Sequence, residues 1–149
     1  MIIVSACLAG INCNYKGQSK PCEKVIKLVK EGKAIPVCPE ILGGLSIPRP
    51  AAEQKNGKII TKDGRDVTAK FLRGAEEGLK IAKLVNCKMA ILKARSPSCG
   101  SNKIYDGSFS GRLIDGDGIF ADLLKKNGIE VFSEEDLEDE RLYKKIEQF

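Results

Sequence analysis

Histidine and tryptophan are absent from this sequence of 149 residues, and aromatic residues make up only 5% of it. Without histidine, the chain cannot build a His-containing zinc site, a Ser-His-Asp triad or a Cys-His dyad. No apolar run is long enough to span a membrane, and the apolar start MIIVSACLAG lacks the basic leader of a signal peptide. We therefore expect a cytoplasmic protein with no membrane partner.

Charge is unevenly distributed along the chain. The net charge is +5, but residues 134–147 hold seven acidic against three basic side chains, which leaves +9 on the residues before them. A basic body can attract anionic ligands, RNA included. Lysines and aromatic residues are not interleaved as they are in a groove for single-stranded nucleic acid. The sequence is compatible with a nucleic-acid partner but does not favour one over a solvated, lysine-rich surface.

Short apolar runs alternate with amphipathic segments, as in βαβ units that form a parallel sheet. The C-terminal helix is expected to begin with Ser133 as its cap, and Asp117 is expected to cap the helix before it. The predicted strands cover residues 2–5, 34–37, 89–92 and 130–132, and the predicted helices before Ser133 cover about 21–31, 68–85 and 118–127.

Two segments interrupt this alternation, and both follow strand ends. Asn56-Gly57 and Asp106-Gly107 are typical hairpin turns between short β-prone pieces. The pattern as a whole predicts a single three-layer, Rossmann-like α/β domain over residues 1–149. Its parallel sheet is short, with about four strands, and hairpins are inserted after strand ends.

The sequence contains six cysteines. In a protein expected to be cytoplasmic, this number favours metal-binding or catalytic thiols over disulfides. No two of them have the C-x-x-C spacing of a zinc ribbon or redox pair, so the fold must bring any metal ligands together. Cys87 precedes the third strand, at the opposite edge, and is expected to be a core or surface thiol. Cys22 lies near a helix start, where the helix dipole would favour the thiolate, but an inert, half-buried thiol is the alternative. The six are Cys7, Cys13, Cys22, Cys38, Cys87 and Cys99.

Three cysteines follow the predicted strands at the same edge of the sheet. Cys7 lies just past the first strand, Cys38 directly follows the second, and Cys99 lies in the Pro/Gly turn after the third. Ligands of open parallel sheets bind beyond the carboxyl ends of the strands, so we expect these thiols to converge. Cys13 shares the loop of Cys7 and is a candidate fourth ligand or redox partner.

Three thiolates suit a thiophilic metal. Structural zinc usually takes a fourth protein ligand, whereas a [4Fe-4S] cluster held by three cysteines leaves one iron open. Three buried structural cysteines are the alternative.

Four ordered motifs carry a resemblance to a known family. SACLAGINCNYKG, VCPEILGGLSIPRP, KARSPSCGS and YDGSFSG, which fall between about residues 5 and 133, resemble the thiouracil desulfidase-like family, formerly a bacterial and archaeal domain of unknown function. The resemblance implies a [4Fe-4S] cluster on Cys7, Cys38 and Cys99. It also implies removal of sulfur from 2- or 4-thiouracil, with uracil and sulfide as products. The run Asn14-Tyr15-Lys16-Gly17 departs from the Arg-Tyr-Asp-Gly that is more frequent in the family.

The reaction that this resemblance implies needs few further residues. A water could attack the carbon that bears sulfur, with Glu40 as the first candidate for the general base. Ser96 is the second candidate, and Ser98 is an alternative hydroxyl for orienting water or passing a proton. Arg49 could donate to a pyrimidine carbonyl or a phosphate, and Tyr105 could stack on the base. Each of these residues also has an ordinary structural explanation, in turn formation, solvation or packing.

Two other functions remain open at this level. A sulfur-transfer or RNA-thiolation partner could use the same open iron and would be favoured by the basic body. A non-enzymatic module with structural zinc or buried thiols would need no cluster.

Overall fold

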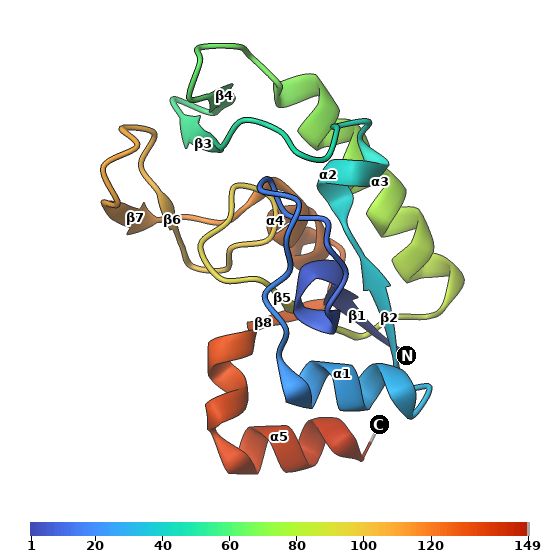
Figure 1. The fold of residues 1–149 in the computed structure, drawn as a ribbon. Coiled ribbons are helices and arrows are strands. Elements are labelled where there is room, and N and C mark those ends of the chain that lie inside the picture. The colour runs from blue at the N-terminus through green and yellow to red at the C-terminus, as the bar shows by residue number, and fades with distance from the viewer. Residues whose placement is uncertain (149) are drawn as a thin grey trace.

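A four-stranded parallel sheet forms the centre of the protein, which is described by a computed structural model covering residues 1–148. The strand order β2-β1-β5-β8 reverses direction at β1, because the chain runs from β1 to β2 and then crosses to β5 on the other side (Figure 1). The predicted α/β fold with a four-stranded parallel sheet is confirmed. The strands are β1 (Ile2–Ser5), β2 (Ala34–Val37), β5 (Met89–Leu92) and β8 (Glu130–Ser133).

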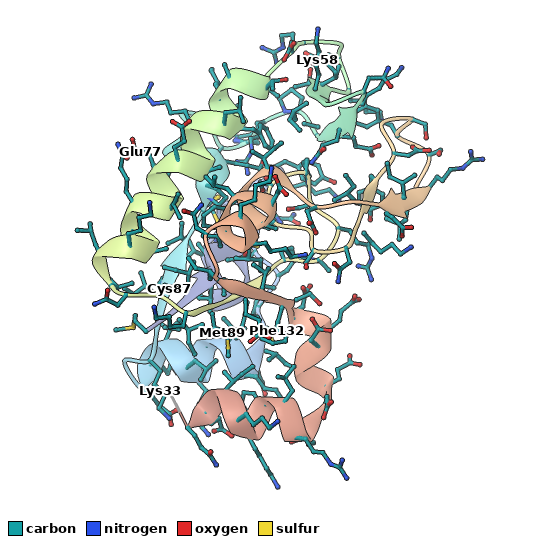
Figure 2. All side chains as sticks on the ribbon, turned by 180° about the vertical axis from the view of Figure 1, so that it is seen from behind. Lys33, Lys58, Glu77, Cys87, Met89 and Phe132 are labelled. Carbon is teal, nitrogen blue, oxygen red and sulfur yellow. The ribbon has the colours of Figure 1, made fainter. Side chains whose placement is uncertain are left out.

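Helices cover both faces of this sheet and make the fold three-layered. Alternation along β1 sends Ile2 and Val4 to one face and Ile3 to the other. The first face packs on α1 and α5, with Met89 and Phe132 between the layers (Figure 2). The opposite face packs on α3 and α4. The helices are α1 (Glu23–Lys30), α3 (Thr68–Leu84), α4 (Ile119–Lys126) and α5 (Glu140–Glu147). Within residues 1–148, no helix is both long and apolar enough to cross a membrane.

Two predicted helix caps differ from the structure. Gly118, not Asp117, is the N-cap of α4. The Asp117 carboxylate instead accepts hydrogen bonds of 2.8 Å from the Asn102 N–H and from Lys125 Nζ, which ties the loop after β5 to α4. Ser133 does form a capping box with Asp136, but this box begins the 3-10 helix η2 (Glu134–Glu138). Asp139 caps α5, so the segment after β8 bends once before the last helix.

Two antiparallel hairpins lie beyond the carboxyl edge of the sheet. β3 (Ala52–Lys55) and β4 (Lys58–Thr61) are joined at Asn56-Gly57, as predicted, with positive φ at both turn residues. β6 (Lys103–Tyr105) and β7 (Leu113–Asp115) form the second hairpin. Its connection covers residues 106–112 rather than the predicted two-residue turn at Asp106-Gly107. Two N–H groups of this loop donate to a side chain of β3.

A short helix that the sequence pattern did not reveal, α2 (Pro39–Leu42), joins β2 to the rest of the chain. It packs closely on α3 through glycines. A Cβ at Gly74 would lie 1.8 Å from the Pro39 carbonyl oxygen, and a Cβ at Gly43 would lie 2.0 Å from that of Lys70. These glycines allow two backbones to touch, which fixes α2 and the residues around it.

Candidate active site, a cavity lined by cysteines

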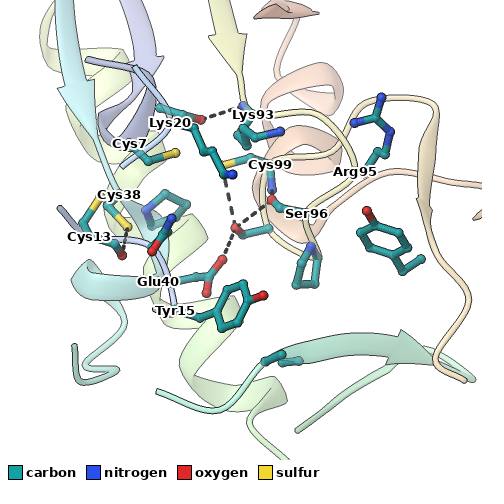
Figure 3. Close-up of a pocket in the computed structure, with 18 of the residues that line it drawn as sticks. Cys7, Cys13, Tyr15, Lys20, Cys38, Glu40, Lys93, Arg95, Ser96 and Cys99 are labelled. Carbon is teal, nitrogen blue, oxygen red and sulfur yellow. Dashed lines mark hydrogen bonds between the residues drawn. The ribbon is translucent and has the colours of Figure 1, made fainter. Parts of the chain in front are cut away.

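A cavity of about 490 Å³ lies at the carboxyl ends of β1, β2 and β5 (Figure 3). Because the strand order reverses between β1 and β5, this is the topological switch point at which open α/β sheets bind ligands. The β3–β4 and β6–β7 hairpins contribute the remaining wall. The structure brings together every site residue that the sequence suggested. Lining the cavity are Cys7, Cys38, Cys99, Glu40, Ser96, Ser98, Arg49 and Tyr105.

Each of the three thiols stands at the end of its strand on a tight backbone turn. Cys7 lies in the 3-10 helix η1 (Ala6–Ala9), directly after β1. Cys38 is the N-cap of α2, directly after β2. Cys99 lies in the turn after β5, where its N–H donates to Ser96 Oγ at 2.7 Å. The backbone of Gly100 adds a second bond to the Ser96 carbonyl, so the Pro/Gly turn is rigid.

The environments of these thiols differ. Burial raises the pKa of Cys7 to about 11, with a further contribution from Cys38. Burial also raises the pKa of Cys99, to about 12, although Ser5 and Ser98 oppose the shift by hydrogen bonding. The pKa of Cys38 is lowered, because the Cys13 thiol and the Ile41 N–H hydrogen bond to its sulfur. Cys38 is therefore the one thiol of the three whose pKa is lowered rather than raised.

Cys13 is buried beside Cys38. The Cys38 thiol donates to the Cys13 carbonyl oxygen at 3.9 Å (Figure 3). The side-chain interaction with Cys38, together with burial, raises the pKa of the Cys13 thiol. The other two cysteines lie elsewhere. Cys22 is the N-cap of α1, and Cys87 is buried near the opposite edge of the sheet, where its thiol donates to the Met89 carbonyl.

The donor set fits a cluster better than a single ion. In the part of the chain that the structure describes, no three Cys, Asp or Glu side chains surround one point closely enough to hold a metal ion. In a cubane each cysteine binds a different iron, so its ligands need not close on one point. Three soft sulfur donors that follow three strands, all of them free thiols around one cavity, fit this requirement.

Glu40 forms a network beside the thiols. Its Oε2 accepts a 2.6 Å hydrogen bond from Ser98 Oγ, and its Oε1 accepts a 3.1 Å bond from Arg49 Nε. The Arg49 side chain is only 5% exposed and also donates to the carbonyl oxygens of Cys13, at 2.9 Å, and Ser46, at 3.2 Å. The carboxylate is thus held in one orientation by a buried cation and a hydroxyl.

The two candidate serines make different contacts. Ser98 Oγ touches Glu40 and lies 3.7 Å from Cys99 Sγ, so it connects the carboxylate to the Cys99 thiol. Ser96 Oγ lies 3.3 Å from Ser98 Oγ and accepts the Cys99 N–H. Of the two serines, only Ser98 contacts the Glu40 carboxylate. Ser96 stabilises the turn that carries Cys99.

Polar and aromatic residues complete the cavity wall. The charged lining is mainly basic. Lys93 pairs with Glu134 at 2.9 Å, and Arg95 pairs with Glu135, so both are partly neutralised from outside the cavity. Phe109 joins Tyr105 on the wall that the second hairpin forms. The cavity also includes Glu53 of β3, which the sequence motifs did not identify. The basic lining residues are Lys20, Arg49, Lys62, Lys93 and Arg95, and the acidic ones are Glu40 and Glu53.

Comparisons with known proteins agree with the motifs. A family model described as 2-thiouracil desulfurase matches residues 2–136. The chain is similar to the protein YbbK of Bacillus subtilis (strain 168). The two are 48% identical over an alignment that covers 93% of this chain and 99% of that protein. It is also similar to a solved structure described as a [4Fe-4S]-dependent thiouracil desulfidase, TudS. That match has 46% identity, covers 95% of each chain and has a TM-score of 0.88.

Proposed function

This chain belongs to the 2-thiouracil desulfurase family, and we propose that it is a [4Fe-4S]-dependent desulfidase that removes sulfur from a thiolated pyrimidine. The proposed substrates are 2- and 4-thiouracil, with uracil and sulfide as products, and the proposed location is the cytoplasm. The observation that carries the proposal is the convergence of Cys7, Cys38 and Cys99 on one cavity beside a fixed carboxylate. Similarity to TudS at 46% identity over 95% of both chains supports the cofactor.

Cys7, Cys38 and Cys99 would hold the cluster, and Cys13 would stay a neighbour of Cys38 rather than a ligand. When bound, a cluster with three cysteine ligands supplies one iron without a protein ligand, which can act as a Lewis acid toward sulfur. The remaining chemistry belongs to the side chains around it.

Glu40 is the proposed general base of a hydrolytic reaction. Its carboxylate takes a proton from a water that attacks the carbon bearing sulfur, so that C=S becomes C=O and the sulfur leaves as sulfide. Arg49 holds Glu40 in place through the 3.1 Å bond to Oε1. All three guanidinium nitrogens of Arg49 already donate to protein acceptors. We therefore assign Arg49 the role of positioning Glu40 rather than that of binding substrate.

Ser98 is the proposed partner of Glu40 in moving protons. Its hydroxyl lies between the carboxylate and the Cys99 sulfur, so it can pass a proton toward the side of the cavity where sulfide leaves. Tyr105 is the proposed stacking surface for the flat ring. Ser96 supports the turn that carries Cys99.

The experiment that tests this function uses protein purified without oxygen and reconstituted with iron and sulfide. We would measure iron per chain, visible absorption and sulfide released from 2- and 4-thiouracil. About four irons, as a cubane requires, together with sulfide release would support the proposal. A loaded but inactive protein would favour the sulfur-transfer or RNA-thiolation alternative, and a colourless protein that binds zinc or no metal would overturn the cluster.

A further inference from the structure

Glu53 is a buried carboxylate that the proposed reaction does not use. It lies on β3, is 9% exposed and lines the cavity. Its Oε1 accepts two backbone hydrogen bonds from the β6–β7 loop, 3.0 Å from the Gly107 N–H and 3.1 Å from the Phe109 N–H. One carboxylate oxygen therefore fixes the loop that brings Phe109 to the cavity.

The loop has the conformation that these bonds require. Gly107 has φ of 95° and Phe109 has φ of 57°, which is uncommon for a bulky residue. A Cβ at Gly107 would lie 2.7 Å from the Gln54 carbonyl oxygen, so the loop backbone packs directly against β3. Asp106 closes the turn by accepting hydrogen bonds from the Ser108 N–H and hydroxyl. Glu53 is thus part of a rigid wall.

The second oxygen of Glu53 has no partner in this wall. No residue among 1–148 donates a hydrogen bond to Oε2. In the same part of the chain, the Tyr143 hydroxyl is the one side-chain N or O atom that is sealed from solvent and has no hydrogen-bond partner. Glu53 Oε2 is therefore not sealed from solvent, and Glu53 is one of the residues that line the cavity.

The cavity offers an N–H donor few other acceptors. Among residues 1–148, Glu40 is the only other acidic side chain in the lining, and the proposed reaction assigns its carboxylate to the attacking water. The other charged lining residues are basic and can only donate. A substrate that carries ring N–H groups finds its free carboxylate acceptor in Glu53.

Building on the proposed function, we infer that Glu53 Oε2 accepts the N3–H of the thiolated pyrimidine and is a specificity-determining residue. N3 lies between C2 and C4, so its N–H flanks the sulfur in 2-thiouracil as well as in 4-thiouracil. One acceptor can therefore serve both substrates. The same carboxylate links ring recognition to the aromatic loop, because its other oxygen holds that loop in place.

The test compares Glu53→Gln with the wild type and with Lys58→Gln, an exposed residue of the adjacent strand β4 (Figure 2). Glutamine can still accept the two loop N–H groups through its amide oxygen, but it turns an NH2 donor toward the ring N–H. Each protein is loaded to equal iron content. Binding of uracil is measured by calorimetry, and kcat and KM are measured for 4-thiouracil, 1-methyl-4-thiouracil and 3-methyl-4-thiouracil.

We expect Glu53→Gln to weaken uracil binding and raise KM by roughly 10- to 100-fold, the usual worth of a hydrogen bond to a charged group, with little change in kcat. The wild type should accept the 1-methyl compound, which keeps N3–H, and discriminate against the 3-methyl compound by at least about tenfold. Glu53→Gln should reduce that discrimination, and Lys58→Gln should leave it unchanged.

Equal use of the two methylated compounds by the wild type, or a Glu53→Gln variant with unchanged uracil affinity, would overturn the inference. Neither result would affect the proposed function if sulfide is still released. Conversely, a loaded wild type that releases no sulfide, yet binds uracil through Glu53, would overturn the desulfidase proposal and leave this inference standing.

Discussion

The Ser98 hydroxyl donates a 2.6 Å hydrogen bond to the Glu40 carboxylate, although the two residues are separated by 58 positions in the chain. Ser98 follows β5 and Glu40 follows β2, while β1 lies between those two strands in the sheet. The bond therefore spans the end of the central strand, where Cys7 stands. It ties together the two turns that carry Cys38 and Cys99.

Glu40→Gln should separate turnover from cluster binding. The amide cannot take a proton from water, so we expect kcat to fall by about 100-fold or more, within the range for loss of a general base. Iron content should stay at the wild-type level, because Glu40 is not a proposed ligand. Glu130→Gln, at the exposed start of β8, is the matched control. Unchanged sulfide release by Glu40→Gln would reject its role as base.

Alanine at each of the two serines should give different losses. Ser98→Ala removes the hydroxyl that contacts Glu40, so sulfide release should fall while iron content is kept. Ser96→Ala removes the acceptor of the Cys99 N–H, so the cluster should be lost more readily on exposure to a chelator. Parallel measurements of sulfide release and iron retention distinguish the two roles. Identical behaviour of the two variants would contradict the assignment.

Replacing any of the three proposed ligand cysteines by serine should reduce binding of the cluster. Cys7→Ser, Cys38→Ser and Cys99→Ser are expected to bind substantially less iron than the wild type, because a hydroxyl is a poor ligand for a soft site. Cys13→Ser and the control Cys22→Ser should keep about four irons per chain, the content of a cubane. Iron analysis and visible absorption check this, and loss of the cluster from Cys13→Ser would make Cys13 a ligand.

Gly74→Ala should destabilise the protein by displacing α2. The new Cβ would lie 1.8 Å from the Pro39 carbonyl oxygen, so backbone must move. Overpacking of this kind costs about 1–3 kcal/mol, and a chain of this size loses about 2–4 °C in Tm per kcal/mol. Glu76→Ala on the exposed side of the same helix is the control. Thermal unfolding followed by circular dichroism measures both, and equal Tm values would show that α2 adapts freely.

The ion pair between Glu147 and Lys27 should make stability depend on pH. Lys27 holds the pKa of Glu147 below its ordinary value of 4.5. A carboxylate whose pKa is lower in the folded than in the unfolded state stabilises the fold at pH values above its unfolded-state pKa. This contribution is lost as the pH falls through the pKa of the folded state. Glu147→Gln should therefore lower Tm slightly at pH 7, and the difference should shrink as the pH falls below 4.5. Glu138→Gln, an exposed residue without an ion pair among residues 1–148, should show no such trend.

Local patterns were sufficient to predict the sheet and the edge of the sheet at which the three cysteines lie. The strands β1, β2 and β5 follow directly from short apolar runs with polar ends, and all three predictions match the observed bounds. Parallel topology then required Cys7, Cys38 and Cys99 to emerge at one edge. The α2 helix escaped detection because its four residues are too few to show a helical period.

Features that depend on distant contacts were not predictable in the same way. Asp117 looks like a cap within its own segment, but it is bound by Asn102 and Lys125. Glu53 lies in a strand of ordinary polar composition, and its partners are more than 50 residues away. Its only local signal is a carboxylate at a position that alternation along β3 turns inward. Likewise, neither the pairing of Ser98 with Glu40 nor the burial of Arg49 has a sequence signature.

The distribution of the three thiols over the chain bears on when the protein can acquire its proposed cofactor. During synthesis, a ribosome releases Cys7 and Cys38 first, but the turn that carries Cys99 comes only after β5 and is held by later residues, since Gly118 donates its N–H to the Gly100 carbonyl. A nascent chain that ends before Gly118 contains all three cysteines, but the turn that carries Cys99 lacks the hydrogen bond from Gly118. The turn that presents Cys99 is therefore complete only after Gly118 has been added, so the proposed cluster site forms late in synthesis.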